Sequence, residues 1–269
     1  MTRFFKTATV FIFINLLILG CTKVPLTNRS QLHMIPGSEM LAMSNQQYGE
    51  FLNENKLSAN KQQSEMVKRV GKNIEKAVTK YLNDNGYSDM LNGYSWEFNL
   101  VKSDQANAWC MPGGKVVVYT GILPITKDET GLAVVMGHEI AHAIARHGNE
   151  RMSQELLRQA GGVALSVALK DNPEETRNYW LAAYGLGSEV GIMLPYSRLQ
   201  ESEADHLGLI FMAIAGYDPR KAPEFWKRMS KAGGTKPPEF LSTHPADETR
   251  INNLKKWMPE AIKYYEESK

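Results

Sequence analysis

Apolar residues recur at helical spacing through much of the chain after position 36. They lie three or four positions apart across 37–57 and 60–82, and those of the second segment include Met66, Val70, Ile74 and Val78. This period places apolar side chains on one face of a helix, so we predict two amphipathic helices over these ranges.

The spacing then changes to every second residue. Trp96, Phe98 and Leu100 alternate with polar residues, and the β-rich run 115–119 follows the turn signal Pro112-Gly-Gly114. Alternation and turn residues of this kind predict strands joined by a tight turn. We therefore expect a small antiparallel sheet inside a mainly helical α+β fold.

An apolar-rich stretch lies between two helix-boundary signals. Thr126-Lys-Asp-Glu129 fits a capping box and Gly148 suits the position after a helix end, so we predict one helix over 127–147. Further helices are predicted over 152–169 and from Pro173, Ser197, Pro219 and Pro245, where a proline or a capping residue opens each segment.

The Gly/Ala-rich segment 160–168 is apolar enough to suggest a membrane helix. Lys170 and Asp171 limit it to about ten residues, short of the roughly 20 that a membrane span needs. We therefore predict a tightly packed core helix at this place.

The first 21 residues have the plan of a secretory signal peptide. Arg3 and Lys6 precede about a dozen mostly apolar residues. Ile18-Leu-Gly-Cys21 resembles the lipobox of bacterial lipoproteins, in which cleavage before the cysteine frees it to carry lipid. The alternative is an uncleaved signal anchor in which Cys21 is an ordinary thiol. We expect a bacterial cell-envelope protein, lipid-anchored through Cys21 and facing the periplasm, with the outer membrane as the favoured side.

Composition narrows the protein class. The 269 residues are 43% apolar and 22% charged, which suits a globular chain and excludes collagen, a disordered tail and a multi-span membrane protein. The 31 Lys and Arg residues exceed the 29 Asp and Glu residues by two, and removal of Arg3 and Lys6 would leave a neutral body. Without a basic excess, we expect no nucleic-acid partner. Cys21 and Cys110 are too few for a disulfide framework.

The predicted helix 127–147 contains the motif His138-Glu-Ile-Ala-His142. Two histidines four positions apart on a helix share one face, so both imidazoles can reach one ion. Nitrogen ligands suit Zn²⁺, and an open coordination position holds a water whose pKa falls towards about 7. Glu139 is placed to take a proton from this water and pass it to a leaving amine. The alternative is a pair of histidines on a surface helix.

Two histidines need a third protein ligand. The extended metzincin pattern is absent, because Ala145 and Gly148 stand where it has glycine and histidine. His147 misses that register by one residue, and we interpret it as a cation near the helix C-terminus. A glutamate from a second helix is the remaining precedent.

The segment 197–206 offers that glutamate. Ser197 and Gln200 fit a capping box, and Glu201 and Asp205 then lie one turn apart on a face that continues through small residues. We predict Glu201 as the third ligand of one zinc ion and Asp205 as the acceptor that orients a zinc-bound imidazole. His206 is the rival ligand, but it shares its face with apolar residues.

Together these motifs resemble the zinc metallopeptidase family of HtpX, BepA, LoiP and the mitochondrial Oma-type quality-control peptidase. The matching segments are 24–29, 107–108, 112–116, 119–123, 138–147, 195–205, 242–245 and 250–251. The resemblance implies a gluzincin-like domain with zinc ligands His138, His142 and Glu201, the base Glu139 and a supporting Asp205. It implies the lipoprotein or periplasmic branch, with a signal peptide at 1–20, a lipidated cysteine and tether at 21–36, and a single metallopeptidase domain at 37–269.

A peptidase must hold an extended peptide across its metal. An exposed strand edge does so by adding the substrate as a further strand. The segments 107–111 and 115–119 are the candidates, with Asn107 and Ala108 as predicted substrate contacts, and the sequence leaves open which segment forms the edge. His244 has three open interpretations: it stabilises an oxyanion, it takes the fourth zinc position in a latent form, or it caps the next helix.

The sequence thus predicts a zinc endopeptidase that cuts misfolded or unassembled envelope proteins. A second hypothesis is a lipoprotein that binds unfolded envelope proteins in the same groove as a chaperone or assembly factor. A third is a zinc hydrolase of small molecules, which would need a closed pocket.

Overall fold

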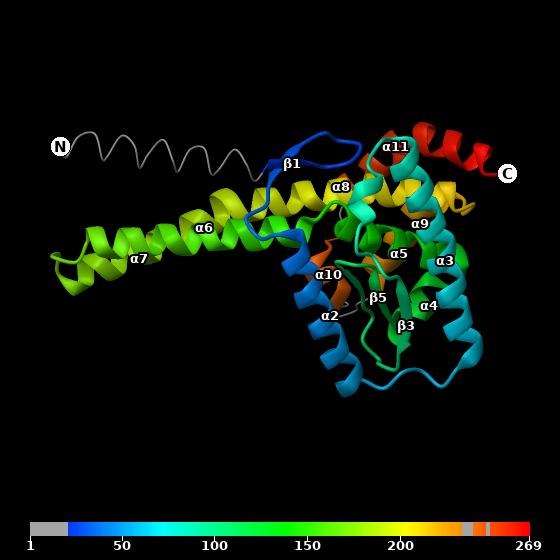
Figure 1. Cartoon of the computed structure of the whole chain (residues 1–269), viewed down its shortest axis with the longest axis horizontal. Coiled ribbons are helices and arrows are strands. Elements are labelled where there is room, and N and C mark those ends of the chain that lie inside the picture. Colours follow the sequence, from blue (N-terminus) through cyan, green and yellow to red (C-terminus); the bar gives the residue numbers. More distant parts are fainter. Residues whose placement is uncertain (1–20, 233–238, 246–247) are drawn as a thin grey trace. The chain divides into compact units, whose positions relative to one another are not determined.

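The computed structural model describes residues 21–232, 239–245 and 248–269, and the chain forms two compact units (Figure 1). Unit 1 contains 21–37 and 146–199, and unit 2 contains the described parts of 38–145 and 200–269. The signal peptide predicted at 1–20 lies outside the described residues. Among the described helices, none is both long enough and apolar enough to cross a membrane.

Unit 2 combines a three-stranded sheet with a set of helices. Its elements are α2 (Gly37–Glu54), α3 (Lys61–Asp84), the 3₁₀ turn Ser88–Leu91, β3 (Glu97–Val101), β4 (Ala108–Met111), β5 (Lys115–Tyr119), the 3₁₀ turn Thr120–Ile122, α4 (Leu123–Thr126), α5 (Glu129–Ile144), most of α8 (Leu194–Ile214), the 3₁₀ turn Pro219–Lys221, α9 (Ala222–Lys231), α10 (Glu239–Thr243) and α11 (Glu248–Glu267). The predicted amphipathic helices at 37–57 and 60–82 are confirmed, with Asn60 capping α3.

The sheet has the strand order β3-β5-β4. β4 and β5 are antiparallel, joined by a tight turn in which Gly113 and Gly114 take φ angles of +87° and +82°, where glycine is favoured. β3 runs parallel to β5, so the small sheet is confirmed but it is mixed rather than purely antiparallel. The chain reverses once between β3 and β4 and again at the turn. These two reversals give β5 the same direction as β3.

Helices cover both faces of this sheet. Tyr48 of α2 packs against Val101 and Val117 on one face. On the other face, Phe98 occupies the space beside Gly71 of α3, where any side chain would collide with its ring. α5 lies along β4 and beside α3, and every residue of α5 from Gly131 to its end at Ile144 is buried. The motif helix is therefore at the centre of unit 2.

The ends of α5 differ from the sequence prediction. Asp128 is the N-cap and accepts from the main-chain N–H of Gly131, while Thr126 ends the preceding short helix α4. The helix stops at Ile144 because Arg146 takes a left-handed conformation, with φ 55°. Gly148 is consequently not a helix terminator and lies inside the next helix. The predicted helix 127–147 therefore extends beyond both ends of α5.

Unit 1 is built from two short strands and a helical hairpin. Its elements are β1 (Cys21–Lys23), β2 (Ser30–Leu32), α6 (His147–Ala168), α7 (Glu174–Ser188), the π-helical turn Glu189–Met193 and the first residues of α8. β1 and β2 pair in antiparallel fashion, with Cys21 opposite Leu32, inside the segment predicted as a tether. Arg29 and Glu150 form a two-bond ion pair at 2.6 and 2.8 Å, which fixes this segment to α6.

Two predictions for this region are wrong. The segment 160–168 is not a core helix, because the buried side chains of α6 are confined to its first two turns. Val163 and Val167 are 65% and 63% exposed. Ser197 does not begin a helix either, since α7 continues through the π-helical turn into α8 at Leu194.

Candidate metal centre

α5 and α8 approach each other closely enough to share one site. A Cβ atom added at Gly208 would lie 2.8 Å from the main-chain nitrogen of His138, and one added at Gly137 would lie 2.9 Å from the carbonyl oxygen of Gly208. The two helix backbones therefore touch at this glycine pair. The small residues predicted on this face of α8 make that contact possible.

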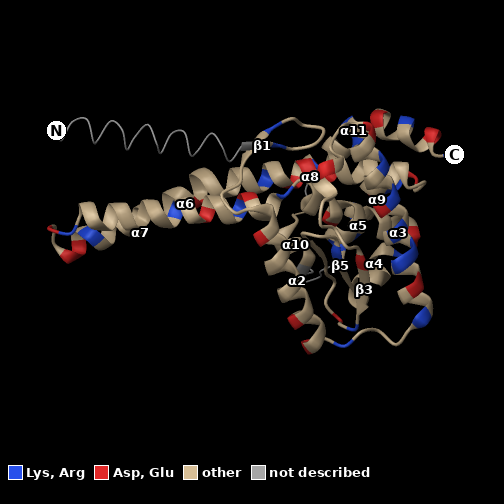
Figure 2. Ribbon diagram, viewed as in Figure 1, with Lys and Arg blue, Asp and Glu red and all other residues tan. Residues whose placement is uncertain are grey.

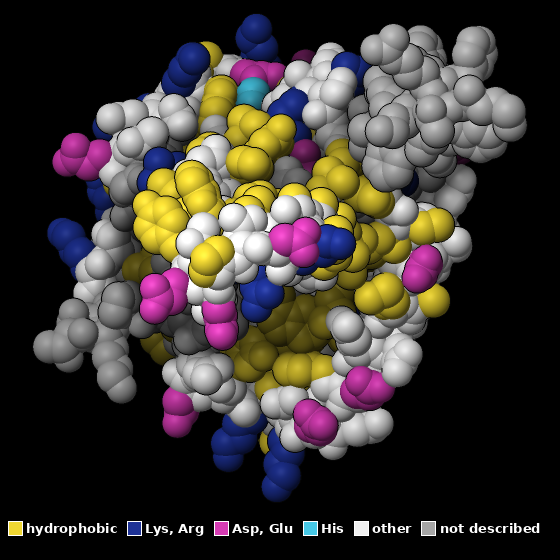
Figure 3. Space-filling view, turned by 90° about the vertical axis from the view of Figure 1, so that its left-hand side faces the viewer, with side chains coloured by type: hydrophobic (Ala, Val, Ile, Leu, Met, Phe, Trp, Pro, Cys, Tyr) yellow, Lys and Arg dark blue, Asp and Glu magenta, His cyan; other side chains and the backbone are white. Residues whose placement is uncertain are grey.

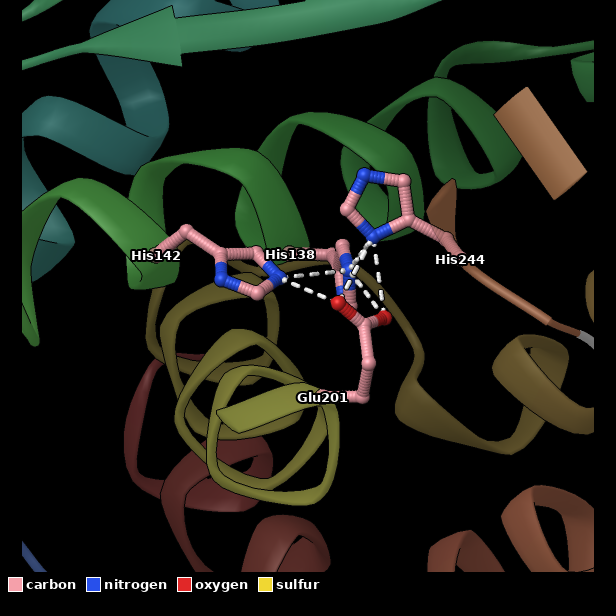
Figure 4. Close-up of side chains that lie close together, drawn as sticks. All are labelled: His138, His142, Glu201 and His244. Carbon is pink, nitrogen blue, oxygen red and sulfur yellow. Dashed lines mark hydrogen bonds and ion pairs between the residues drawn. The ribbon is translucent and has the colours of Figure 1, made fainter. Parts of the chain in front are cut away.

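Four side chains converge next to this contact (Figure 4). His138 and His142 extend from α5, Glu201 from α8 and His244 from the segment after α10. One ligand atom from each lies within 4.8 Å of all the others. His138 Nε2 is 3.1 Å from His142 Nε2 and 3.0 Å from His244 Nδ1, and the Glu201 carboxylate is 2.9 Å from His244 Nδ1.

These positions fit a tetrahedral zinc site. Zinc–nitrogen bonds of about 2.1 Å place tetrahedral ligand atoms about 3.4 Å apart. The closest Glu201 oxygens lie 3.4 Å from His138 Nε2 and 3.2 Å from His142 Nε2, near that spacing. Three imidazole nitrogens and a carboxylate oxygen are a donor set that zinc prefers. The cluster is consistent with one zinc ion per chain.

Asp205 contacts the His138 imidazole on the side that faces away from the cluster. Asp205 Oδ1 lies 2.9 Å from His138 Nδ1, the ring nitrogen that points away from the cluster. A carboxylate beside Nδ1 favours the tautomer that carries its proton there and leaves Nε2 as the ligand atom. Asp205 therefore occupies the position that the sequence predicted for an orienting acceptor.

Arg250 of α11 is a part of the site that the sequence reasoning did not assign. Its guanidinium donates to Glu201 Oε2 and to Asp205 Oδ2, both at 2.6 Å, and to the carbonyl oxygens of His244 and Pro245. It also stacks over the Trp226 ring at 3.8 Å. One buried cation thus links both carboxylates of α8 to the segment that carries His244. No local pattern around position 250 signals this role, because its partners lie 45 and 49 residues earlier in the chain.

Burial and charge set the ionisation of the cluster. Burial opposes protonation of His138, but Asp205 and Glu201 outweigh it and raise the pKa of this imidazole to about 9. Burial also opposes ionisation of Glu201, whereas hydrogen bonds from the three histidines lower the pKa of its carboxyl well below the usual range. Glu201 is therefore an anion suited to a cation.

Glu139 is buried on the motif helix between the two histidines in sequence. Its Oε1 lies 3.5 Å from His244 Nε2, on the far side of that ring from the ligand atom Nδ1. The carboxylate thus lies at the edge of the cluster without being a member of it. Glu139 is the residue that the sequence predicted as the proton acceptor, and that role remains a prediction.

The other candidate residues lie outside the cluster. His206 contacts Glu260 at 2.7 Å and stacks on Trp257, so the rival ligand is engaged elsewhere. His147 begins α6 in unit 1 and therefore does not belong to the end of the motif helix, which stops at Ile144. Burial, with a smaller effect from Glu139, raises the pKa of the Cys110 thiol, which does not favour a nucleophile.

Asn107 and Ala108 lie at the start of β4, which is an edge of the sheet beside α5. The Asn107 side chain accepts from the Ala108 N–H, and its carbonyl accepts from Tyr119 of β5. The alternative segment, β5, is the central strand and has no free edge.

Comparisons with known proteins agree with this geometry. A model described as peptidase family M48 matches residues 69–258. Mitochondrial metalloendopeptidase OMA1 of Schizosaccharomyces pombe is 36% identical over 190 residues, which are 70% of this chain and 53% of that protein. Metalloendopeptidase OMA1 of Homo sapiens is 30% identical over 252 residues, 90% of this chain and 47% of the relative. The β-barrel assembly-enhancing protease of Yersinia pestis is 31% identical over 188 residues, 66% of this chain and 38% of the relative. The chain spans about half, or less, of these relatives.

Proposed function

The chain belongs to peptidase family M48, and from that premise we propose that it is a zinc-dependent endopeptidase. The observation that carries the proposal is the convergence of His138, His142, Glu201 and His244, with Glu139 beside them. Zinc bound by this cluster supplies a Lewis acid that polarises a peptide carbonyl and acidifies water. Glu139 accepts the proton of the attacking water and returns it to the leaving amine.

We propose that the substrate binds along β4. Since the carbonyl of Asn107 accepts from Tyr119 of β5, alternation along an antiparallel strand directs the main-chain groups of Ala108 and Cys110 away from β5. An extended peptide paired to this edge runs beside α5, which carries the zinc ligands. Asn107 holds the Ala108 N–H and so sets where pairing begins.

His244 is proposed as the fourth ligand of a resting site. Its Nδ1 lies 3.0 Å from His138 Nε2 and 2.9 Å from Glu201, in the group of ligand atoms rather than at its edge. A fourth protein ligand leaves no open position for water. We therefore expect His244→Ala to keep zinc and to raise peptidase activity severalfold. A large loss of activity with zinc retained would instead assign the ring to oxyanion stabilisation.

The proposed substrates are misfolded or unassembled proteins of a bacterial envelope. The apolar leader at 7–19 and the lipobox-like Ile18-Leu-Gly-Cys21 support an envelope location with a lipid anchor at Cys21, facing the periplasm at the outer membrane. The name of the Yersinia pestis relative points to a protease that enhances β-barrel assembly. An unfolded chain presents the extended backbone that an edge strand can pair with.

A Glu139→Gln variant tests the proposed reaction. The amide keeps the size of the side chain but cannot accept the proton, so cleavage of unfolded casein should fall at least about 100-fold while zinc stays bound. Glu129→Gln is the matched control, because Glu129 begins the same helix and pairs with Arg69 at the surface. A chelator should stop the parent protein, and added zinc should restore it.

The same variant separates the two function hypotheses. If the protein acts in the cell by cleaving its substrates, Glu139→Gln abolishes its cellular function. Full biological activity of this variant would contradict the peptidase proposal and favour a chaperone or assembly factor that only binds unfolded proteins.

A further inference from the structure

The α6–α7 hairpin exposes a set of large apolar side chains. We call residues 155–190 the arm. Its most exposed apolar residues are Val163 (65%), Val167 (63%), Tyr179 (67%), Leu186 (69%) and Val190 (56%), with Leu156, Leu157 and Trp180 also exposed. Hydrophobic side chains of this kind are visible on the face that Figure 3 presents. A contiguous apolar surface on a folded protein marks a contact with another molecule or with a membrane.

The apolar residues follow a pattern on each helix. On α6, positions 156, 160, 163 and 167 form one stripe at intervals of three and four residues, and on α7, positions 179, 183 and 186 form another. These stripes are not the surface between the two helices. That surface is marked by the Tyr184 hydroxyl, which donates to the carbonyl of Arg158 and fills the space beside Gly161.

Polar residues occupy a separate face of the arm. Glu155, Gln159 and Ser166 of α6 are spaced to share one side of that helix, next to the apolar stripe. The arm is therefore amphipathic, with exposed apolar stripes and a polar side. This is the composition of a helix pair that lies within an interface between water and apolar material.

Charge is absent from the middle of the arm. No Lys, Arg, Asp or Glu occurs in 159–169 or in 178–188, and the charged residues are at the connection 170–177 and at the base (Figure 2). Eleven helical residues span about 16 Å, so the uncharged zone is a broad band on both helices. Tyr179 and Trp180 stand at the outer end of this band, next to the charged connection. Amphipathic aromatic rings of this kind prefer the headgroup level of a bilayer.

The chain itself indicates a lipid surface rather than another partner. The apolar leader at 7–19 ends immediately before Cys21, and Cys21 already belongs to β1 of unit 1. β1 pairs with β2, and Arg29, one residue before β2, is ion-paired to Glu150 at the base of α6. A membrane anchor formed by the leader or by Cys21 is therefore joined directly to unit 1, which carries the arm.

We propose that the arm lies in the interfacial layer of the membrane to which the N-terminal segment attaches, with its apolar stripes among the lipids and its polar side in water. The arm proposal goes beyond the proposed peptidase activity. It depends on the proposed envelope location only for which membrane the arm contacts. The arm and the anchor then act as two contacts of one unit.

Site-specific labelling of the full-length chain in vesicles tests this proposal. An environment-sensitive NBD fluorophore is attached at Val163→Cys, with Asn45→Cys, at an exposed polar position of α2 outside the arm, as the control. Cys21 and Cys110 are replaced by serine in both proteins, so that the fluorophore has one site of attachment and the leader remains as the anchor. The vesicles contain phosphatidylethanolamine and phosphatidylglycerol, with and without a nitroxide-labelled lipid that quenches NBD. We expect at least a twofold loss of fluorescence at position 163 and little loss at position 45.

Two results would overturn the proposal. Equal and weak quenching at both positions would mean that the arm stays in water. An NBD signal at position 163 that responds to protein density in the vesicles, but not to nitroxide lipid, would mean that a second copy of the chain covers the stripes. Casein cleavage by the same labelled samples is measured separately, so a failure of the arm proposal is distinguishable from a failure of the peptidase proposal.

Discussion

Arg250 connects several parts of the metal cluster. Its guanidinium contacts Glu201, which faces the metal position, and Asp205, which orients His138. It also holds the main chain at His244 and Pro245. A planar group with five N–H donors can serve all these acceptors together, which an ammonium ion cannot do. We interpret Arg250 as a positioning residue for three of the four ligands.

Replacement of Arg250 by lysine tests this role at the residue scale. The charge is retained but the forked hydrogen bonds are lost, so we expect zinc affinity to fall about 10- to 100-fold with the fold preserved. Competitive titration with a chromogenic chelator measures the change. Arg220→Lys is the control, because Arg220 pairs with Asp218 at the surface of the same unit. Unchanged zinc affinity in Arg250→Lys would contradict the positioning role.

His33 provides a pH-dependent residue in unit 1. Burial, followed by the positive charge of Arg146, lowers the pKa of this imidazole to about 4 from its ordinary value of 6.5. In the unfolded chain His33 binds a proton near pH 6.5, but the folded unit resists it. Stability is therefore expected to decrease as the pH falls from about 6.5 to 4.

A His33→Gln variant removes this contribution. Urea unfolding at pH 7 and pH 5 should show a larger loss of stability in the parent than in the variant, because only the parent has an imidazole that gains a proton on unfolding at pH 5. Equal losses in both proteins would show that His33 does not titrate as described.

At the element scale, the contact between α5 and α8 decides the geometry of the cluster. The backbones touch at Gly137 and Gly208, directly beside His138. An added methyl group would separate the helices and move Glu201 relative to the two motif histidines. Packed helices do not absorb such a displacement easily, because protein interiors are as dense as organic crystals.

Gly208→Ala is expected to weaken both the fold and the metal site. Overpacking at such a contact costs about 1–3 kcal/mol, and we expect zinc affinity to fall about 10-fold or more. The control is Gly49→Ala in α2, where nothing lies within 4 Å of the added carbon. That change should stabilise its helix by about 0.5–1 kcal/mol. Thermal unfolding and zinc titration of both variants measure the difference; two stable variants with parental affinity would contradict the close helix contact.

The sequence predicts those elements whose signals are local. Helices α2 and α3 follow from apolar periodicity and an asparagine cap, and β5 follows from its β-rich run after the glycine turn. The two ends of α5 were predicted wrongly because other local signals determine them. Capping by Asp128 competes with the Thr126 signal, and the left-handed Arg146 ends α5 where a glycine would be expected. The exposed arm was mistaken for core because its composition does not reveal which faces are covered.

At the scale of the whole molecule, the site joins residues that lie far apart in the sequence. The motif predicts His138, Glu139 and His142 as a local unit, and a capping-like segment indicates Glu201, although its capping interpretation is wrong. The positions of His244 and Arg250 depend on how the chain returns to α5 after more than 100 residues. No periodicity encodes that return, so the sequence left the role of His244 open and did not assign Arg250 at all.

Zinc removal should therefore affect the stability of the whole chain. Since zinc binds the folded cluster, a free concentration about 1,000 times the dissociation constant stabilises the protein by about 4 kcal/mol. Thermal unfolding with zinc and with a chelator measures this shift. His138→Gln should lose the response, whereas His206→Gln should keep it, because His206 contacts Glu260 and not the cluster. A full response in His138→Gln would contradict the ligand assignment.

X-ray absorption at the zinc edge, on the full-length chain with its zinc content determined, tests the central claim most directly. The account predicts one zinc per chain, with nitrogen and oxygen neighbours at about 2.0–2.1 Å, imidazole scattering from more than one histidine and no sulfur. It also predicts that Glu201→Gln loses most of the zinc. A sulfur neighbour, the absence of histidine scattering, or full zinc retention in Glu201→Gln would contradict the metal centre described by the structure.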